Sequence, residues 1–225
     1  MKNLVNDFRG WERWEYAWLF AAVYAVSMAA WQLGGGWLAF ISTVTNIICV
    51  ILVAHGKITN YFWGMLGALS YGIVSFQWGF YGESILNLAY YAPMQIIGFL
   101  FWRERLDQTD SVVRRKLNFE QSVIALIIAA LFSAGLSAIL SLMGGKLTVL
   151  DAITTVLSVI AVIFMTMRLR EQWILWITVN ILSIIMWAIA LQEGSESAPA
   201  VLVMWGVFLV NSAYGYWKWG RLYNE

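Results

Sequence analysis

Long runs of apolar residues, broken at short intervals by small and charged residues, dominate the sequence. A bilayer core of about 30 Å needs roughly 20 helical residues, at about 1.5 Å per residue, so runs of this length predict membrane-spanning helices. Eight runs qualify: 16–33, 37–54, 58–78, 84–102, 119–143, 148–167, 173–191 and 198–217. The pattern predicts an all-α integral membrane protein with about eight transmembrane helices.

The basic residues support this count. With eight spans, one side of the membrane holds both termini and the second, fourth and sixth loops, and that side carries every one of the 14 Lys and Arg residues except Lys146. Cytoplasmic loops are enriched in Lys and Arg. Both termini are therefore predicted to be cytoplasmic, and one span more or fewer would destroy the split.

The composition excludes several other classes of protein. Hydrophobic residues make up 61% and charged residues 12%, against about 45–50% and about 25% in soluble domains. The net charge of +1 indicates no nucleic-acid partner. A single cysteine, Cys49, permits no intrachain disulfide, and with His55 as the only histidine a Cys/His metal site is excluded.

A weak internal repeat divides the chain. Trp63 aligns with Trp176 at an offset of 113 residues, and Trp102 aligns with Trp217 at an offset of 115. The expected organisation is two parallel three-helix bundles joined by a linking helix, a 3+1+3 plan of the parallel-repeat type found in transporters, with an extra N-terminal helix. The predicted parts are the extra helix (1–36), the first bundle (37–104), the linker with the linking helix (105–147) and the second bundle (148–225).

The middle of each predicted span lacks Asp, Glu, Lys and Arg; Asp151 falls at a helix start, where a carboxylate suits the helix dipole. Ion-coupled carriers usually place an ionisable group at depth, and a hydrolase needs an acid, a base or a metal. Facilitated diffusion is therefore expected, and an enzyme is not. His55 is expected at the membrane interface, as are Trp102, Trp173, Trp217 and Trp219 near helix ends.

Neutral polar and aromatic residues mark a candidate binding site. Trp176, Asn180 and Trp187 follow one another at i, i+4 and i+11, which places them on one helix face, and Asn211 and Tyr214 share a face of the next helix. Amides can bond reciprocally to a primary amide, and aromatic faces can hold a flat ring; a cationic ring would gain roughly 0.5–2 kcal/mol more. We expect Asn180 and Asn211 to hydrogen-bond a ligand and the aromatic residues to pack on it.

Four residues of the first bundle complete the predicted site. Tyr91 and Gln95 are expected to close its other side, and Asn46 and Gln77 are further candidates. Asn46 equally fits a helix–helix contact, and Ser and Thr residues in these spans can bond their own backbone. Pro93 is expected to kink the fourth span.

The stretches 173–180 and 211–217, with Trp63-Gly64 and 87–91, resemble the PnuC-type nicotinamide riboside transporters of bacteria. The resemblance covers about 37–221. It implies the 3+1+3 architecture of the SWEET sugar carriers and movement of nicotinamide riboside, a vitamin B3 precursor for NAD synthesis, down its gradient by alternating access, with a cytoplasmic kinase trapping the product. It also implies no cofactor or ion, and a homotrimer in the inner membrane.

The residues alone do not select the vitamin. Asn also bonds ribose hydroxyls, and thiamine is likewise a flat cation, so a carrier of thiamine or riboflavin stays open. The remaining alternatives are a membrane scaffold and an enzyme subunit.

Overall fold

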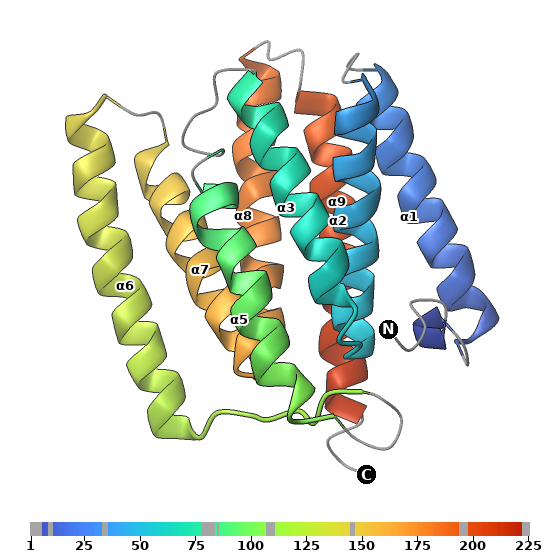
Figure 1. Ribbon diagram of the computed structural model, residues 1–225. Coiled ribbons are helices and arrows are strands. Elements are labelled where there is room, and N and C mark those ends of the chain that lie inside the picture. The colour runs from blue at the N-terminus through green and yellow to red at the C-terminus, as the bar shows by residue number, and fades with distance from the viewer. Residues whose placement is uncertain are drawn as a thin grey trace. The chain divides into compact units, whose positions relative to one another are not determined.

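The computed structural model describes residues 6–8, 11–32, 36–77, 84, 86–106, 111–144, 147–193 and 198–221. These residues form eight α-helices and two short helical elements, labelled in Figure 1. The first half contains η1 (Asn6–Phe8), α1 (Arg13–Gln32), α2 (Gly36–His55), α3 (Asn60–Gln77), η2 (Leu86–Tyr91) and α5 (Ala92–Arg103). The second half contains α6 (Phe119–Leu142), α7 (Thr148–Thr166), α8 (Gln172–Gln192) and α9 (Ala198–Arg221). The all-α prediction is confirmed.

Each predicted span coincides with a helix, but the fourth is not one α-helix. It begins as the π-helix η2 and continues as α5, with Pro93 as the second residue of α5. Pro93 has no N–H, so the hydrogen bond that a regular helix would make to the Ala89 carbonyl cannot form. A wider π turn immediately before the proline is the form that the predicted distortion takes.

Three described helices are long and apolar enough to cross a membrane by length and composition alone. They are α6, α7 and the 172–189 part of α8. The other helices carry more aromatic and polar residues, and α2 contributes a shorter apolar stretch, 40–55. The second half of the chain therefore carries the strongest apolar signal.

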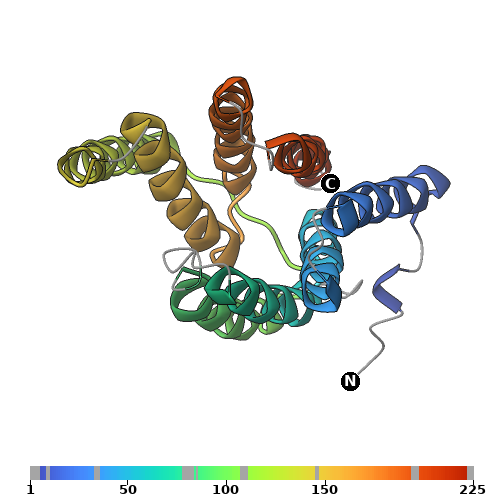
Figure 2. The same cartoon turned by 90° about the horizontal axis from the view of Figure 1, so that it is seen from above.

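The helices pack as two compact units, residues 1–113 and 114–225. In unit 1, α2 packs against both α1 and α3, and α3 packs against α5; in unit 2, α6, α7, α8 and α9 follow one another as neighbours (Figure 2). The division between the units falls inside the predicted linker.

The same turn ends α2 in unit 1 and α7 in unit 2. The Lys57 N–H donates to the Leu52 carbonyl at 2.9 Å, and the Leu169 N–H donates to the Phe164 carbonyl at 2.8 Å, which closes each helix with a bond that spans five residues. Such a closure needs a left-handed residue. Gly56 supplies it in α2 with φ of 70°, and Arg168 supplies it in α7 with φ of 64°.

Each unit also contains an aromatic ring that packs on a glycine and meets a tryptophan edge-on, a contact that we call the aromatic lock. In unit 1 the Tyr61 ring lies against Gly98 and meets Trp102 edge-on at 5.1 Å. In unit 2 the Trp173 ring lies against Gly215 and meets Trp219 edge-on at 5.9 Å. A β-carbon on either glycine would collide with the ring, so only glycine allows the approach.

This lock corrects two expectations from the sequence. Trp102, Trp173 and Trp219 are 0%, 2% and 0% exposed, so they are packed inside the protein and do not face lipid as the residues of an aromatic belt do. The partner of Trp102 in the repeat is Trp219, not Trp217, which is 46% exposed. Aligning identical residues in the sequence paired Trp102 with the exposed Trp217. The shared contact with a ring packed on glycine pairs it with the buried Trp219 instead.

The linker is bonded to the turns rather than free. In unit 1 the Val112 N–H donates to the Gly56 carbonyl at 2.9 Å. In unit 2 the Arg115 N–H donates to the Arg168 carbonyl, and the Arg170 N–H donates to the Arg115 carbonyl, both at 2.8 Å. Each half of the linker is thus fixed to the turn of its own unit.

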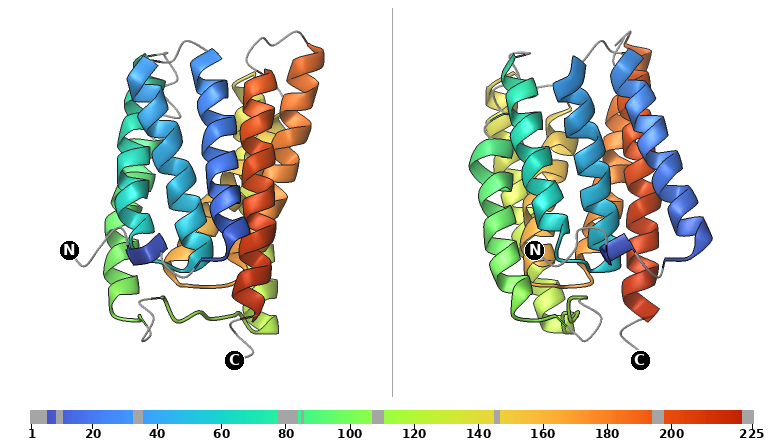
Figure 3. Two further views of the ribbon diagram at one scale, coloured as in Figure 1. Left: turned by 90° about the vertical axis from the view of Figure 1, so that its right-hand side faces the viewer. Right: turned by 45° about the vertical axis from the view of Figure 1, so that its right-hand side comes forward.

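The N-terminal segment packs against the end of unit 1 at which α2 ends (Figure 3). His55 Nε2 lies 3.2 Å from Glu15 Oε1, and the Trp11 ring stacks on the imidazole at 3.8 Å with an 8° angle between the planes. His55 is the last residue of α2 and is 5% exposed, so it is packed inside the protein, and its place at the membrane interface stays a prediction. A carboxylate and a stacked indole are what allow a histidine to be buried there.

Candidate functional site

The predicted carboxamides of unit 2 lie in the α8–α9 contact. The Asn180 side chain donates from Nδ2 to Ser212 Oγ at 3.0 Å, and both residues are buried. Asn211, the neighbour of Ser212 in α9, is 2% exposed. The structure therefore places Asn180 next to residues 211 and 212 of α9. All three side chains are polar and buried, so each needs a hydrogen-bond partner.

Two tryptophans flank Asn180 along α8. Trp176 and Trp187 are both half-buried, and Ser183, between them on the same face, is 5% exposed. The predicted stripe of α8 thus alternates partly accessible rings with buried polar groups. This arrangement can present flat apolar surface together with hydrogen-bonding groups.

Tyr214 has a partner that the sequence did not predict. Lys218 donates from Nζ to Tyr214 Oη at 2.7 Å, and its ammonium lies 5.2 Å from the centre of the Tyr214 ring. The two residues are one helical turn apart, so the contact follows directly from helix geometry. Tyr214 therefore already holds a cation at the basic end of α9.

In unit 1, Asn46 lies where α2 crosses α3. Its Nδ2 donates to the Ser42 carbonyl at 2.9 Å, and its Oδ1 would be 2.6 Å from a β-carbon on Gly67. The absence of a side chain at Gly67 makes room for the amide. This contact supports the expectation that Asn46 joins two helices, and its half-buried side chain also leaves part of the amide accessible.

Gln95 from α5 reaches α3 in a similar way. Its Oε1 would be 2.5 Å from a β-carbon on Gly64, where the Cys49 Sγ also lies close, at 2.9 Å. Among the described residues, neither Gln95 Oε1 nor the Nε1 of Trp63 has a hydrogen-bond partner, although both atoms are buried. A buried acceptor and a buried donor of this kind are suited to a ligand that supplies the missing partners.

A ridge of small residues on α3 makes these close contacts possible. Gly64 and Ala68 are buried, and a β-carbon on Gly72 would meet the Leu88 side chain of η2. Small residues allow helix backbones to approach closely. The ridge is therefore what brings the polar side chains of α2 and α5 against α3.

The last two predicted residues are less informative. Tyr91 ends η2, half-buried, with its ring 5.4 Å from that of Tyr90. Gln77 is the last residue of α3, and its side chain lies outside the described residues. Five of the nine predicted residues thus belong to unit 2 and four to unit 1.

Sequence reasoning missed Ser212 as the partner of Asn180, although Ser212 directly follows the predicted Asn211. Trp63 lies on a polar stripe of its helix but was not among the nine predicted site residues. Their roles depend on the rotation of one helix against another, which a single-helix pattern does not give.

Amides, a hydroxyl and aromatic rings are groups that can bind a small polar or aromatic ligand. Among the described residues there is no group of three or more His, Cys, Asp or Glu side chains that could hold a metal ion. The described Lys and Arg residues lie at helix ends or in loops. The helices and their neutral polar interiors define a multi-helix membrane protein.

Comparisons with known proteins identify the family. A family model described as nicotinamide mononucleotide transporter matches residues 36–221. The nicotinamide riboside transporter PnuC of Neisseria mucosa is 36% identical over 220 residues, which cover 96% of this chain and 84% of the relative. Its counterpart in Haemophilus influenzae is 37% identical over 216 residues, covering 95% and 92%.

A solved structure agrees with these relatives. The crystal structure of the vitamin B3 transporter PnuC superposes with a TM-score of 0.82 at 34% identity, covering 97% of this chain and 96% of that one. The chain belongs to the PnuC family of bacterial membrane transporters. The family model begins where α2 begins, but the full-length relatives align through α1 as well.

Proposed function

We propose that this protein carries nicotinamide riboside across the bacterial inner membrane by facilitated diffusion, with alternating access to a neutral polar and aromatic site. The observation that carries the proposal is the buried amide group at the α8–α9 contact, Asn180 with Asn211, in a chain that aligns over 95–96% of its length with two named riboside transporters. The nicotinamide carboxamide both donates and accepts hydrogen bonds, as an Asn side chain does.

The chemistry of the interior favours the riboside over the mononucleotide named in the family description. A phosphate adds a charge of about −1.5 to −2 at neutral pH. Burying such a charge without a cation is costly, and the described Lys and Arg residues lie at the helix ends. The riboside has no phosphate; its flat ring is a cation, which aromatic side chains can hold by cation–π attraction while amides bond the carboxamide and ribose.

Orientation and assembly are parts of the same proposal. The basic residues gather at the ends of the helices that include both chain termini, which supports a cytoplasmic position for both. Family membership supports a homotrimer. In the helices that the structure describes, no Asp, Glu, Lys or Arg lies near the middle, which supports transport down the gradient with no coupled ion.

Calorimetric titration of the purified protein with nicotinamide riboside tests the proposal. We expect saturable binding that weakens roughly tenfold or more in Asn211→Leu, because a buried hydrogen bond to the ligand is worth about 1–3 kcal/mol when one partner is removed. Thr178→Val is the matched control, since the Thr178 hydroxyl bonds the Ile174 carbonyl of its own helix at 2.9 Å.

Parallel titrations distinguish the alternatives. Binding of thiamine or riboflavin in place of the riboside would keep a carrier and change its vitamin. Tight binding of the mononucleotide would contradict the charge argument. If folded protein, judged by size exclusion and thermal melting, binds none of these compounds, the vitamin-carrier proposal fails and a scaffold or enzyme subunit replaces it.

A further inference from the structure

The two units share their helix turns and aromatic locks but differ in charge at the end where those turns lie. In unit 1 the described charged residues at that end are balanced: basic Arg13, Lys57, Arg103 and Arg105 against acidic Asp7, Glu12, Glu15 and Glu104. In unit 2 the described basic residues come from the linker, the α7–α8 turn and the end of α9: Arg114, Arg115, Lys116, Arg168, Arg170, Lys218 and Arg221. Only Glu120 and Glu171 oppose them there among the described residues.

Several contacts bring these basic residues to one end of unit 2, and we call the seven residues just named the basic collar. Arg115 is bonded through its backbone to both Arg168 and Arg170. The Arg170 guanidinium lies 4.2 Å from the centre of the Tyr216 ring and close against Gly220, so the α7–α8 turn also touches the end of α9. The Arg114 guanidinium lies 5.3 Å from the centre of the buried Trp219 ring. The linker, the α7–α8 turn and the end of α9 are therefore in contact, which places the collar residues at one end of unit 2.

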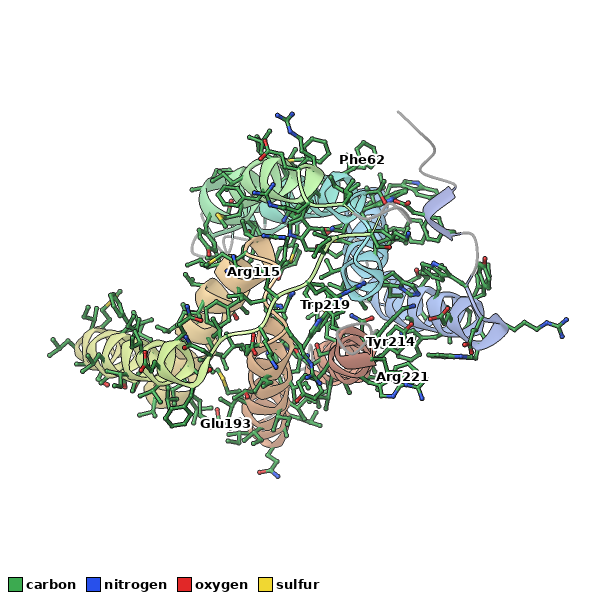
Figure 4. All side chains as sticks on the ribbon, turned by 90° about the horizontal axis from the view of Figure 1, so that it is seen from below. Phe62, Arg115, Glu193, Tyr214, Trp219 and Arg221 are labelled. Atoms are coloured by element: carbon green, nitrogen blue, oxygen red, sulfur yellow. The ribbon has the colours of Figure 1, made fainter. Side chains whose placement is uncertain are left out.

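The outer face of α9 joins this collar to an apolar stripe. Val203, Val210 and Trp217 recur every seven residues and are 45%, 52% and 46% exposed. One turn after Trp217, the Arg221 guanidinium lies 4.4 Å from the centre of its ring. Figure 4 shows Tyr214 and Arg221 on one side of the α9 end, with Trp219 on another side. An apolar face that leads to an aromatic ring and then to a cation follows the order of acyl chain, interface and headgroup phosphate in a lipid.

We infer that the basic collar of unit 2 is a binding site for anionic phospholipid headgroups, with an acyl chain along the Val203–Val210–Trp217 stripe of α9. The partner must be anionic, because the collar has a local excess of positive charge that neutral headgroups do not offset. It must be a lipid, because the apolar stripe continues directly from the basic end. Arg and aromatic groups provide the planar, phosphate-directed donors and the interfacial anchor that such a headgroup needs.

The matched design uses three exposed basic residues from each unit. The collar variant is Arg115→Gln with Lys116→Gln and Arg221→Gln. The control variant is Arg13→Gln with Arg103→Gln and Arg105→Gln, which removes the same charge from the balanced end of unit 1. None of the six is a predicted substrate-binding residue, so riboside binding serves as a separate check on the proposed function.

The measurement is thermal stabilisation of the full chain in neutral detergent by dioctanoyl phosphatidylglycerol, with dioctanoyl phosphatidylcholine and glycerol phosphate as comparisons. Each basic residue near an anionic surface is worth about fivefold in affinity, so we expect the half-maximal phosphatidylglycerol concentration to rise at least about tenfold in the collar variant. The control variant should change it less than about twofold.

Three results would overturn the inference: equal shifts in both triple variants, equal stabilisation by phosphatidylcholine, or equal stabilisation by glycerol phosphate, which would make the ligand a free phosphate ester. Arg221→Gln alone provides the same comparison if the triple variant does not fold, with an expected rise of about fivefold. If the parent protein binds phosphatidylglycerol as expected but does not bind the riboside, the proposed function fails and this inference stands.

Discussion

At the scale of single residues, the polar and aromatic positions on one helix face were predictable, but their partners were not. The spacing of Trp176 and Asn180 follows from helix geometry alone, and Asn180 is indeed buried. Its contact with Ser212 depends on how α8 is rotated against α9. Likewise, Gly98 and Gly215 gave no signal of their own, because their role is to receive a ring from a helix distant in sequence.

Gly215→Ala tests this reading of the aromatic lock. The new β-carbon would lie 2.6 Å from three ring atoms of Trp173, so the ring must move and the packing with Trp219 must be lost. We expect a loss of about 1–3 kcal/mol in the free energy of unfolding, the usual cost of overpacking, measured by denaturant titration in detergent.

The matched control is Gly206→Ala in the same helix, where nothing lies within 4 Å of the new β-carbon. Alanine should be neutral or stabilise by about 0.5–1 kcal/mol through its helix propensity. Equal effects of the two substitutions would show that helix propensity, and not the ring contact, determines the result.

At the scale of helices, the number and approximate bounds of the elements were predictable because apolar runs alternate with glycines and charged turns. The π-helix at 86–91 was predicted only as a distortion at Pro93, since the sequence shows the missing N–H but not how the backbone accommodates it. The repeat was predicted in outline, but its register differs: the matched turn residues Gly56 and Arg168 are 112 positions apart, not 113, and the matched Trp102 and Trp219 are 117 apart, not 115.

The docking of the N-terminal segment on α2 was not predictable, because it joins residues 40 apart through a buried pair. Glu15→Gln keeps the shape of the side chain but removes the carboxylate beside His55. We expect a loss of about 1–3 kcal/mol in the free energy of unfolding, because a buried hydrogen bond to a carboxylate is replaced by a weaker one to a neutral amide.

Melting curves of purified protein provide the measurement. Glu104→Gln, an exposed carboxylate at the same end of unit 1, should stay within about 0.5 kcal/mol of the parent protein. A Glu15 variant as stable as this control would show that the pair with His55 adds nothing to the fold.

At the scale of the whole molecule, the fold class and family follow from the sequence, and the all-helical architecture agrees with the PnuC crystal structure at a TM-score of 0.82. The physical reason is that a chain this apolar has few ways to satisfy its backbone in lipid other than helices. The substrate is not determined in the same way, because neutral amides and aromatic rings are compatible with several flat vitamins. Selection among them depends on the relative placement of a few hydrogen-bonding atoms.

Uptake of labelled nicotinamide riboside into proteoliposomes tests the central claim most directly. We predict saturable entry that stops when the inner and outer concentrations are equal, is unaffected by collapsing proton or sodium gradients, and is lost in Asn211→Leu but kept in Thr178→Val. Accumulation above the outer concentration that depends on an ion gradient, or the absence of saturable entry with correctly folded protein, would contradict the account.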